Sequence, residues 1–393
     1  MTFGYAVYAS DRYVLASVLE PLQTSLGLSS FQVGLLGAAQ YVGVTCFVFL
    51  AGHLSDRYGR GSIVLIGVII FSVFTGLIGL STNFLEAFIF RLISGFGEGI
   101  FWPVAMASVA AHFETRKGLA LGIFYVGFDM GGVVGLSIGG ITYLLSDSWR
   151  PAFFVAPTLG IVAIVGIILT KNKFQNRAND NGQFDSNIKL GWDALDLLKR
   201  RNVSLLMIFA LLATWAAVWQ AVFLPYYFFK VMHYTVLSSA LLASVVLAFG
   251  ALGKVVLGGA SDYVNRNKLL PIITFTLLVF YAVFFESHNF IVNLYGAMGI
   301  GFLSAAIFPI MQSLAADSCD GKTGTALGLT TTTQSIATVF STLIAGSLFT
   351  IGIGRSLALD AMVPAGLAVA VAIFLKEPRP VPRKSLLEEQ LSG

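Results

Sequence analysis

The sequence predicts an all-α membrane protein with twelve transmembrane helices arranged in two six-helix halves. Apolar residues make up 56% of the 393 residues and charged residues only 11%. This composition suits a helical bundle surrounded by lipid rather than by water. The chain also divides into twelve apolar segments of about 20 residues or more, the length that crosses a bilayer core of ~30 Å. The two halves of the chain resemble each other in sequence.

The twelve spans are defined by breaks in the apolar runs at charged residues, Gly, Pro and Asn. The first six are expected near residues 3–27, 31–54, 62–81, 84–112, 117–145 and 151–171. The second six are expected near residues 203–231, 235–260, 268–287, 289–316, 322–351 and 355–376.

One long hydrophilic stretch, rich in Lys and Arg, separates the two sets of spans. Its composition is typical of a solvated linker, with a short surface helix near residues 192–198. The expected domains are an N-terminal bundle (1–171), a cytoplasmic linker (172–201), a C-terminal bundle (202–376) and a cytoplasmic tail (377–393).

The distribution of basic residues predicts the orientation of the chain. Most Lys and Arg residues fall in loops after even-numbered spans or beside the second set of spans, and only Arg150, Lys230 and Arg355 fall on the other side. Loops on the cytoplasmic side carry the excess of positive charge. We therefore expect a multi-pass protein of the cell membrane with both termini in the cytoplasm.

The two halves align at a constant offset of 206 residues. The matching residues are Gly52, Ser55, Asp56 and Arg60 with Gly258, Ser261, Asp262 and Arg266, Pro103 with Pro309, and Gly140 with Gly346. Such parallel repeats place a substrate path between the halves, near the middle of the bilayer.

The loop after the second span carries a family signature. The run from Gly52 to Arg60, Gly-His-Leu-Ser-Asp-Arg-Tyr-Gly-Arg, resembles the signature loop of major facilitator superfamily transporters, and the run from Gly258 to Arg266 is similar to a degraded second copy. The resemblance covers essentially the whole chain and implies the fold of that superfamily. Glycines allow close helix approach, and charged side chains can pair with neighbouring helix ends. We expect a conformation-dependent cytoplasmic gate formed by Gly52, Asp56, Arg57, Arg60, Asp262 and Arg266, with a plain charged turn as the alternative.

The fifth span carries a glycine motif. The pattern Gly131-x-x-x-Gly135-Leu136-x-x-Gly139-Gly140 resembles a motif common in proton-driven exporters. Leu136 stands where that motif has a proline. Without the proline, the glycines require no more than close helix packing.

Four ionisable residues lie inside the first and fourth spans. Asp11 and Arg12 are in the first, and Arg91 and Glu98 are seven residues apart on one face of the fourth. Charges at mid-bilayer cost ~2.5–3.5 kcal/mol on insertion scales, so such residues usually face a cavity or a partner. The sequence does not decide which arginine pairs with which carboxylate. Protonation that releases an arginine would couple proton movement to anion binding or to gating, and a permanent salt bridge is the alternative.

These residues carry a second resemblance. The run Asp11-Arg12-Tyr-Val-Leu-Ala-Ser-Val-Leu, together with Arg91-x-x-x-Gly-x-Gly-Glu98-Gly, resembles two branches of the superfamily, the anion:cation symporters and the Spinster-like transporters. The resemblance implies that Asp11 and Glu98 carry proton coupling. It also implies that Arg12 and Arg91 are their charge partners or contact an anion.

Further residues are candidates to line the cavity. Asp129 lies near the middle of the fifth span, and Lys254 of the eighth would either contact an anion opposite Arg91 or extend to the cytoplasmic surface. An aromatic stripe at helical spacing is compatible with a binding wall or with packing. The remaining candidates are Trp215, Trp219 and Gln220 in the seventh span, Gln312 in the tenth and Gln334 in the eleventh.

These features predict a secondary transporter that works by alternating access, with proton-coupled symport of a small organic anion as the favoured function. Sodium in place of the proton, a Spinster-like carrier of lysolipid or another amphipathic lipid, and a proton-driven exporter of hydrophobic compounds are the alternatives. No phosphate-binding loop, paired metal ligands or nucleophile constellation occurs, so we expect no catalytic residues, metal, cofactor or nucleic acid. An intramembrane enzyme or a receptor-like sensor is the rival of a different class. We expect a monomer surrounded by membrane lipid.

Overall fold

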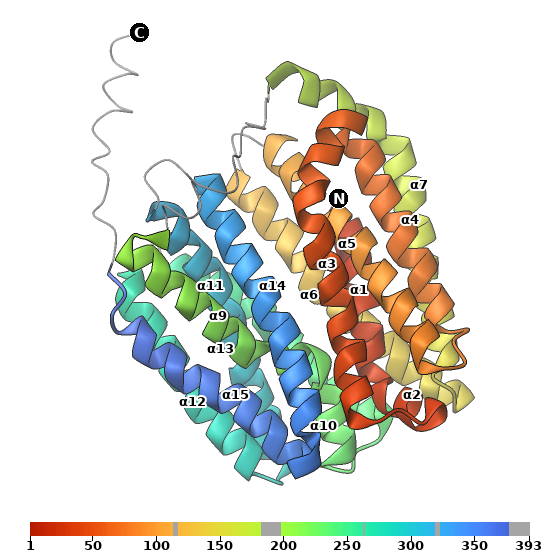
Figure 1. Cartoon of the computed structure of the whole chain (residues 1–393), viewed down its shortest axis with the longest axis vertical. Helices are drawn as coiled ribbons and strands as arrows, with labels where there is room; N and C mark the ends of the chain where they lie inside the picture. The colour runs from red at the N-terminus through yellow and green to blue at the C-terminus, as the bar shows by residue number, and fades with distance from the viewer. Residues whose placement is uncertain (113–116, 182–197, 262–263, 319–322, 377–393) are drawn as a thin grey trace.

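The computed structural model describes residues 1–112, 117–181, 198–261, 264–318 and 323–376 (Figure 1). All regular elements in these residues are helical. The first half contains α1 (Thr2–Ser17), α2 (Leu19–Leu26), α3 (Ser30–Tyr58), α4 (Arg60–Ile78), α5 (Phe84–His112), α6 (Lys117–Ser146) and α7 (Arg150–Asn181). The second half contains α9 (Arg201–Val222), α10 (Leu224–Lys230), α11 (Val236–Ala260), α12 (Arg266–Glu286), α13 (Phe290–Asp317), α14 (Thr323–Leu348), the short 3-10 helix η2 (Phe349–Ile351) and α15 (Ile353–Ala372).

Eleven of the described helices are each long and apolar enough to cross a membrane. The remaining predicted span, near residues 3–27, is divided between α1 and α2. The prediction of an all-α membrane fold in two six-helix halves is therefore confirmed. The orientation of the termini and the domain boundaries stay predictions. Helix α7 continues past the predicted span end at 171, and the predicted surface helix falls almost entirely outside the described residues.

The repeat offset reappears in the positions at which the helices begin. Helices α3, α4, α5 and α6 begin 206 residues before α11, α12, α13 and α14 respectively. The caps repeat as well, because Ser29 accepts a hydrogen bond from the backbone of Gln32, and Thr235 accepts one from that of Ser238. Each hydroxyl satisfies a free N–H group of the first helical turn. Equivalent sequence signals thus start equivalent helices in the two halves.

The first and seventh spans are both interrupted. The break between α1 and α2 lies at Val18, and that between α9 and α10 lies at Phe223. Pro21 and Pro225 follow these breaks and have no N–H group to donate to the carbonyl group four residues earlier. The predicted spans 3–27 and 203–231 are therefore each built from a long and a short segment.

The glycine motif of α6 packs closely against α1. A Cβ atom at Gly131 would overlap the carbonyl oxygen of Ala6, and one at Gly135 would overlap that of Ser10. The absence of side chains lets the two backbones approach each other. The motif therefore acts here in helix packing, as the substitution of Leu136 for proline suggested.

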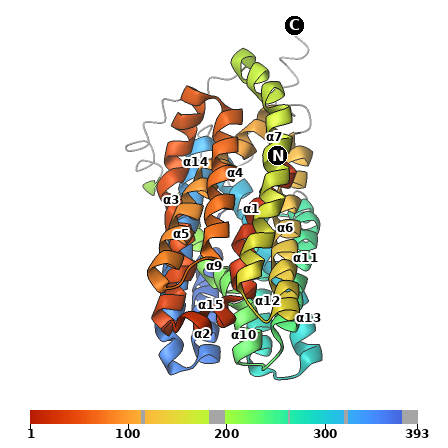
Figure 2. The ribbon, with the colours of Figure 1, turned by 90° about the vertical axis from the view of Figure 1, so that its right-hand side faces the viewer.

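The two halves meet along two pairs of helices, α3 with α14 and α6 with α11. Gly34 and Gly346 touch through their backbones, and Gly140 lies against Leu237 and Ala240. These contacts are at the end of the bundle where α2 and α10 lie, at the bottom of Figures 1 and 2. We call this the closed end and the opposite one, at which α6 and α14 begin, the linker end.

Candidate substrate cavity

A cavity of about 790 Å³ lies between the two halves. Its walls come from α1, α3, α5 and α6 on one side and from α9, α11, α13 and α14 on the other. It includes Ile123, Val255, Gln312 and Thr331, which lie in the parts of their helices that are nearest the linker end. The cavity therefore extends from the middle of the bundle toward the linker end.

Arg12 faces this cavity from α1 and pairs with Glu98 of α5. One guanidinium nitrogen of Arg12 lies 2.7 Å from Glu98 Oε2, and Nε lies 3.2 Å from the same oxygen. Arg12 also donates to the Tyr8 hydroxyl at 2.7 Å, and its guanidinium lies 4.7 Å from the ring centre of Tyr41. Gln40 of α3 donates to Glu98 Oε1. Both oxygens of a fully buried carboxylate are thus satisfied.

Two glycines bring Gln40 within reach of Glu98. A Cβ atom at Gly95 of α5 would overlap the carbonyl oxygen of Gln40, and one at Gly99 would lie 2.6 Å from that of Val44. The backbones of α3 and α5 are therefore close together at the level of Glu98. The glycines around Glu98 in the sequence pattern have this packing function.

Arg91 occupies a different position from Arg12. Its guanidinium donates to the backbone carbonyl groups of Asp11 and Arg12, each at 3.1 Å. Arg91 does not line the cavity, and neither does the fully buried Asp11, whose carboxylate oxygens have no hydrogen-bond partner among the described residues. The structure thus brings together the four charges predicted from sequence, pairs Arg12 with Glu98, and joins Arg91 to the backbone of α1.

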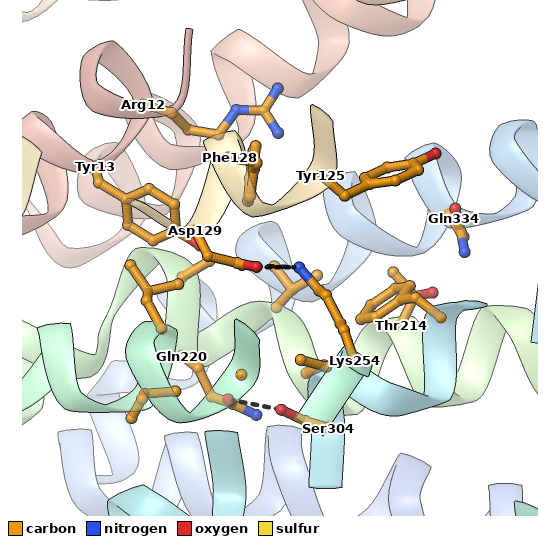
Figure 3. Close-up of a pocket in the computed structure, with 18 of the residues that line it drawn as sticks. Arg12, Tyr13, Tyr125, Phe128, Asp129, Thr214, Gln220, Lys254, Ser304 and Gln334 are labelled. Carbon is orange, nitrogen blue, oxygen red and sulfur yellow. Dashed lines mark hydrogen bonds and ion pairs between the residues drawn. The ribbon is translucent and has the colours of Figure 1, made fainter. Parts of the chain in front are cut away.

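Asp129 and Lys254 join the two halves across the cavity. Lys254 Nζ of α11 lies 2.7 and 2.8 Å from the two carboxylate oxygens of Asp129 on α6 (Figure 3). Lys254 therefore lies in the cavity wall and does not extend to the membrane surface. The expected position opposite Arg91 is wrong, because the arginine that lines the same cavity is Arg12.

The two walls of the cavity differ in chemistry. The first half contributes many aromatic rings, among them Tyr5, Tyr8, Tyr13, Trp102, Tyr125 and Phe128. The second half contributes small and apolar residues together with neutral polar groups, among them Thr214, Ser304, Gln312, Thr331, Gln334 and Ser335. Gln220 also lines this wall, where it accepts a hydrogen bond from Ser304 at 3.2 Å (Figure 3) and donates to Tyr281.

The two tryptophans predicted to line the cavity lie elsewhere. Trp219 is fully buried inside the second half, with its ring against those of Tyr281 and Phe285. Trp215 donates from Nε1 to the carboxylate of Asp360 at 2.7 Å. Neither residue lines the cavity. Their stripe therefore serves packing and hydrogen bonding inside the second half.

Comparison with known proteins places this architecture in a family. The sequence profile of the Major Facilitator Superfamily matches residues 1–342. The chain belongs to this superfamily. It is therefore a multi-pass membrane transporter and not an enzyme, and the family predicted from the sequence motifs is confirmed.

Relatives of the chain include anion transporters and protein spinster. The chain is 26% identical to the hexuronate transporter of Bacillus subtilis over 65% of this chain and 62% of that protein. It is 31% identical to the "Probable 4-methylmuconolactone transporter" of Cupriavidus pinatubonensis over 41% of this chain and 39% of that protein. It is 28% identical to protein spinster of Drosophila melanogaster over 45% of this chain and 29% of that protein. The matches thus cover less than two thirds of each relative's length.

A solved structure shares the fold over almost the whole chain. It is a bacterial homologue of the human lysosomal transporter Spinster, in an inward-facing and unoccupied conformation. The TM-score is 0.76 at 18% sequence identity, and the alignment covers 95% of this chain and 93% of that one.

The predicted gate of this superfamily member lies at the linker end. Arg60 and Arg266 begin α4 and α12, and Arg57 is exposed with its guanidinium 5.4 Å from the ring centre of Tyr58. The surroundings of Gly52, the side chain of Asp56 and the whole of Asp262 fall outside what the structure describes. The gate therefore stays a prediction.

Asp360 is a buried acid that sequence reasoning missed. It lies in α15, is 3% exposed, and accepts hydrogen bonds from Trp215 and from Ser341 at 2.9 Å. An acidic residue inside the twelfth predicted span was a sufficient signal to identify it. It lies outside the cavity lining.

Proposed function

We propose that this transporter carries a small organic anion across the cell membrane in symport with protons, as a monomer. The observation that carries the proposal is the presence of two cationic side chains, Arg12 and Lys254, in one cavity between the halves. Each cation is paired with a carboxylate, Glu98 or Asp129. Paired cations at mid-membrane are suited to exchange one anion for another at limited electrostatic cost. The relatives named for hexuronate and 4-methylmuconolactone support this substrate class.

Alternating access would proceed by opening the closed end while the linker end closes. Halves that touch at one end and enclose a cavity toward the other are suited to this rocking motion around a central site. By the distribution of basic residues, the linker end is the cytoplasmic one. We therefore take the structure as the inward-open state, with both termini in the cytoplasm.

Proton coupling would act through Glu98 and Asp11. A proton on Glu98 removes the charge that holds Arg12 and leaves the guanidinium free to bind an anion from the cavity. Asp11 is buried beside this pair on the same helix as Arg12, and its backbone carbonyl accepts a hydrogen bond from Arg91. Its carboxylate would be the second site for a proton.

A Spinster-like lipid carrier is the second candidate. The aromatic first-half wall and the similarity to protein spinster favour it. An amphipathic lipid with an anionic head group would place the head on Arg12 or Lys254 and its chain along the aromatic rings. The two candidates therefore share an anionic group and differ in the size of the apolar part.

The test measures proton uptake into proteoliposomes with an internal pH dye. Mono- and dicarboxylates, sugar acids, phosphate esters and lysolipids are added in turn, with a sodium gradient replacing the proton gradient in a parallel series. We expect proton uptake that depends on the added organic anion, and we expect Glu98→Gln and Asp11→Asn to abolish it. If none of the small anions causes proton uptake and labelled lysolipid is transported, the second candidate replaces the first.

A further inference from the structure

The Asp129–Lys254 pair is placed where the contact between α6 and α11 meets the cavity. From the closed end, these helices touch first at Gly140 and Leu237, then at Gly132 and Leu247. The ion pair follows toward the linker end, and both of its side chains line the cavity. A solute that enters from the linker end therefore reaches a junction between the two halves.

The two members of the pair differ in accessibility. The Lys254 side chain is 22% exposed, whereas that of Asp129 is 3% exposed. Lys254 Nζ also lies 5.8 Å from the ring centre of Phe128, which leaves the ammonium between an acid, a ring and the open cavity. Lys254 is thus the member of the pair that a solute can contact. The Asp129 carboxylate already occupies the position on the ammonium group where another anion would bind.

We propose that the carboxylate group of the transported solute takes the place of Asp129 on Lys254. This inference rests on the proposed function, because it requires an anionic cargo. Exchange of one carboxylate for another keeps the ammonium group paired, whereas removal of Asp129 without replacement would leave an unpaired charge inside the membrane. The displaced Asp129 remains at the cavity wall, where water that enters from the linker end can solvate it.

The pair also acts as a selectivity element. A neutral hydroxyl or amide group of a solute cannot compete with a bidentate carboxylate for an ammonium group, since charge-assisted hydrogen bonds are roughly twice as strong as neutral ones. A solute with a carboxylate makes the same kind of charge-assisted hydrogen bond to Lys254 as Asp129 does. Asp129 therefore excludes neutral solutes from Lys254 and admits anionic ones.

The surrounding wall indicates the shape of the anion. Tyr13, Tyr125 and Phe128 line the cavity around the pair (Figure 3), and aromatic rings pack well against flat apolar groups. Thr214 and Gln334 of the second half add neutral polar side chains to the cavity wall. The arrangement fits a carboxylic acid with a flat, unsaturated or aromatic body better than a sugar acid, whose hydroxyl groups would meet the rings.

The rival account makes the pair a fixed strut that only holds α6 and α11 together. A strut and an exchange site predict opposite effects of removing the acid. Loss of Asp129 from an exchange site removes a competitor and tightens anion binding. If the pair is only a structural contact, loss of Asp129 weakens the contact between the halves and does not tighten anion binding.

The experiment measures calorimetric binding of benzoate and of glucuronate to the purified full-length chain in detergent. We expect Asp129→Asn to bind benzoate about ten-fold more tightly than the wild type, and Lys254→Gln to bind it at least ten-fold more weakly. Asp360→Asn is the matched control, since it removes another buried acid away from Lys254, and its affinity should equal that of the wild type. Benzoate should bind more tightly than glucuronate throughout.

Equal or weaker benzoate binding by Asp129→Asn would overturn the inference in favour of the strut. If the wild type still moves carboxylates in proteoliposomes, the proposed function survives that result. Absence of carboxylate binding and flux in the wild type would overturn both. Should Asp129→Asn prove unstable, benzoate is expected to raise its melting temperature more than that of the wild type, and an equal or smaller rise would also overturn the exchange.

Discussion

Glu20 of α2 and Lys230 of α10 form an ion pair between the two halves, with 2.8 Å between Glu20 Oε1 and Lys230 Nζ. Beside it, the Tyr226 hydroxyl donates to Gln23 Oε1 at 2.7 Å. Both contacts join the short segments that follow the breaks in the first and seventh spans. The breaks thus produce two equivalent half-helices whose side chains tie the closed end together.

We predict that Glu20→Gln shifts the transporter toward states in which the closed end is open. The pair is partly exposed, and such pairs contribute at most about 1 kcal/mol, so the population ratio should change up to about five-fold. Spin labels at Ser25 and His233, in a chain without Cys46 and Cys319, would report a larger share of long distances. Glu286→Gln alters an exposed acid at the same end and should leave the distribution unchanged. An unaltered distribution in Glu20→Gln would show that the ion pair does not hold the end closed.

The Arg12–Glu98 pair makes a prediction about stability. Removing one member of a buried ion pair typically costs about 3–5 kcal/mol, because the other charge stays in an apolar environment. Arg12→Met and Glu98→Met should therefore each lower the melting temperature strongly in detergent. The double variant should recover most of that loss, since it removes both charges. Losses that simply add in the double variant would mean that the two residues are not energetically coupled.

The sequence was sufficient to predict the helices, because local signals define them. Ser29 and Thr235 start helices, and long apolar runs give the helices membrane length. These signals act within a few residues of one another, so they can be recognised without knowledge of the fold. The interruptions at Val18 and Phe223 were not predicted, since the apolar runs continue through them. The repeat added the equivalence of the two halves.

The pairing of the charges was not predictable in the same way. Arg12 and Glu98 are separated by 86 residues, and their contact depends on the rotation of α1 and α5 about their axes. Asp129 and Lys254 come from different halves, so their contact depends on the conformation as well. The helical stripe that contains Trp219 is similarly ambiguous, because an aromatic face suits the core of one half as well as the cavity wall.

The glycine motif of α6 predicts a position-specific effect. Gly131→Ala would place a methyl group against the carbonyl oxygen of Ala6, and overpacking of this kind typically costs about 1–3 kcal/mol. Gly166→Ala in α7 meets nothing within 4 Å and should leave the stability unchanged or raise it by up to about 1 kcal/mol. Melting temperatures of the two purified variants give the comparison. A Gly131→Ala chain as stable as the wild type would contradict the close contact between α1 and α6.

Asp360 predicts a three-helix hydrogen-bonded junction in the second half. Its two carboxylate oxygens accept from Trp215 of α9 and Ser341 of α14, so one side chain of α15 holds two neighbouring helices. Asp360→Ala leaves the Trp215 indole N–H without an acceptor, whereas the Ser341 hydroxyl keeps the Trp215 carbonyl oxygen at 3.3 Å. An unsatisfied buried polar group costs about 1–3 kcal/mol. Asp360→Asn keeps one acceptor oxygen and should lie between the wild type and Asp360→Ala in melting temperature.

Trp215→Phe separates this junction from a general effect of burying an acid. The substitution removes the indole N–H donor, so Asp360→Ala should cost less in a Trp215→Phe background than in the wild type, because the donor that Asp360→Ala would leave without an acceptor is already absent. Melting temperatures of the two single variants and the double variant form the cycle that measures this coupling. If the losses of melting temperature in the two single variants add in full in the double variant, Trp215 and Asp360 act in separate contacts. If the loss in the double variant is smaller than the sum, Asp360 links α15 to α9 through Trp215.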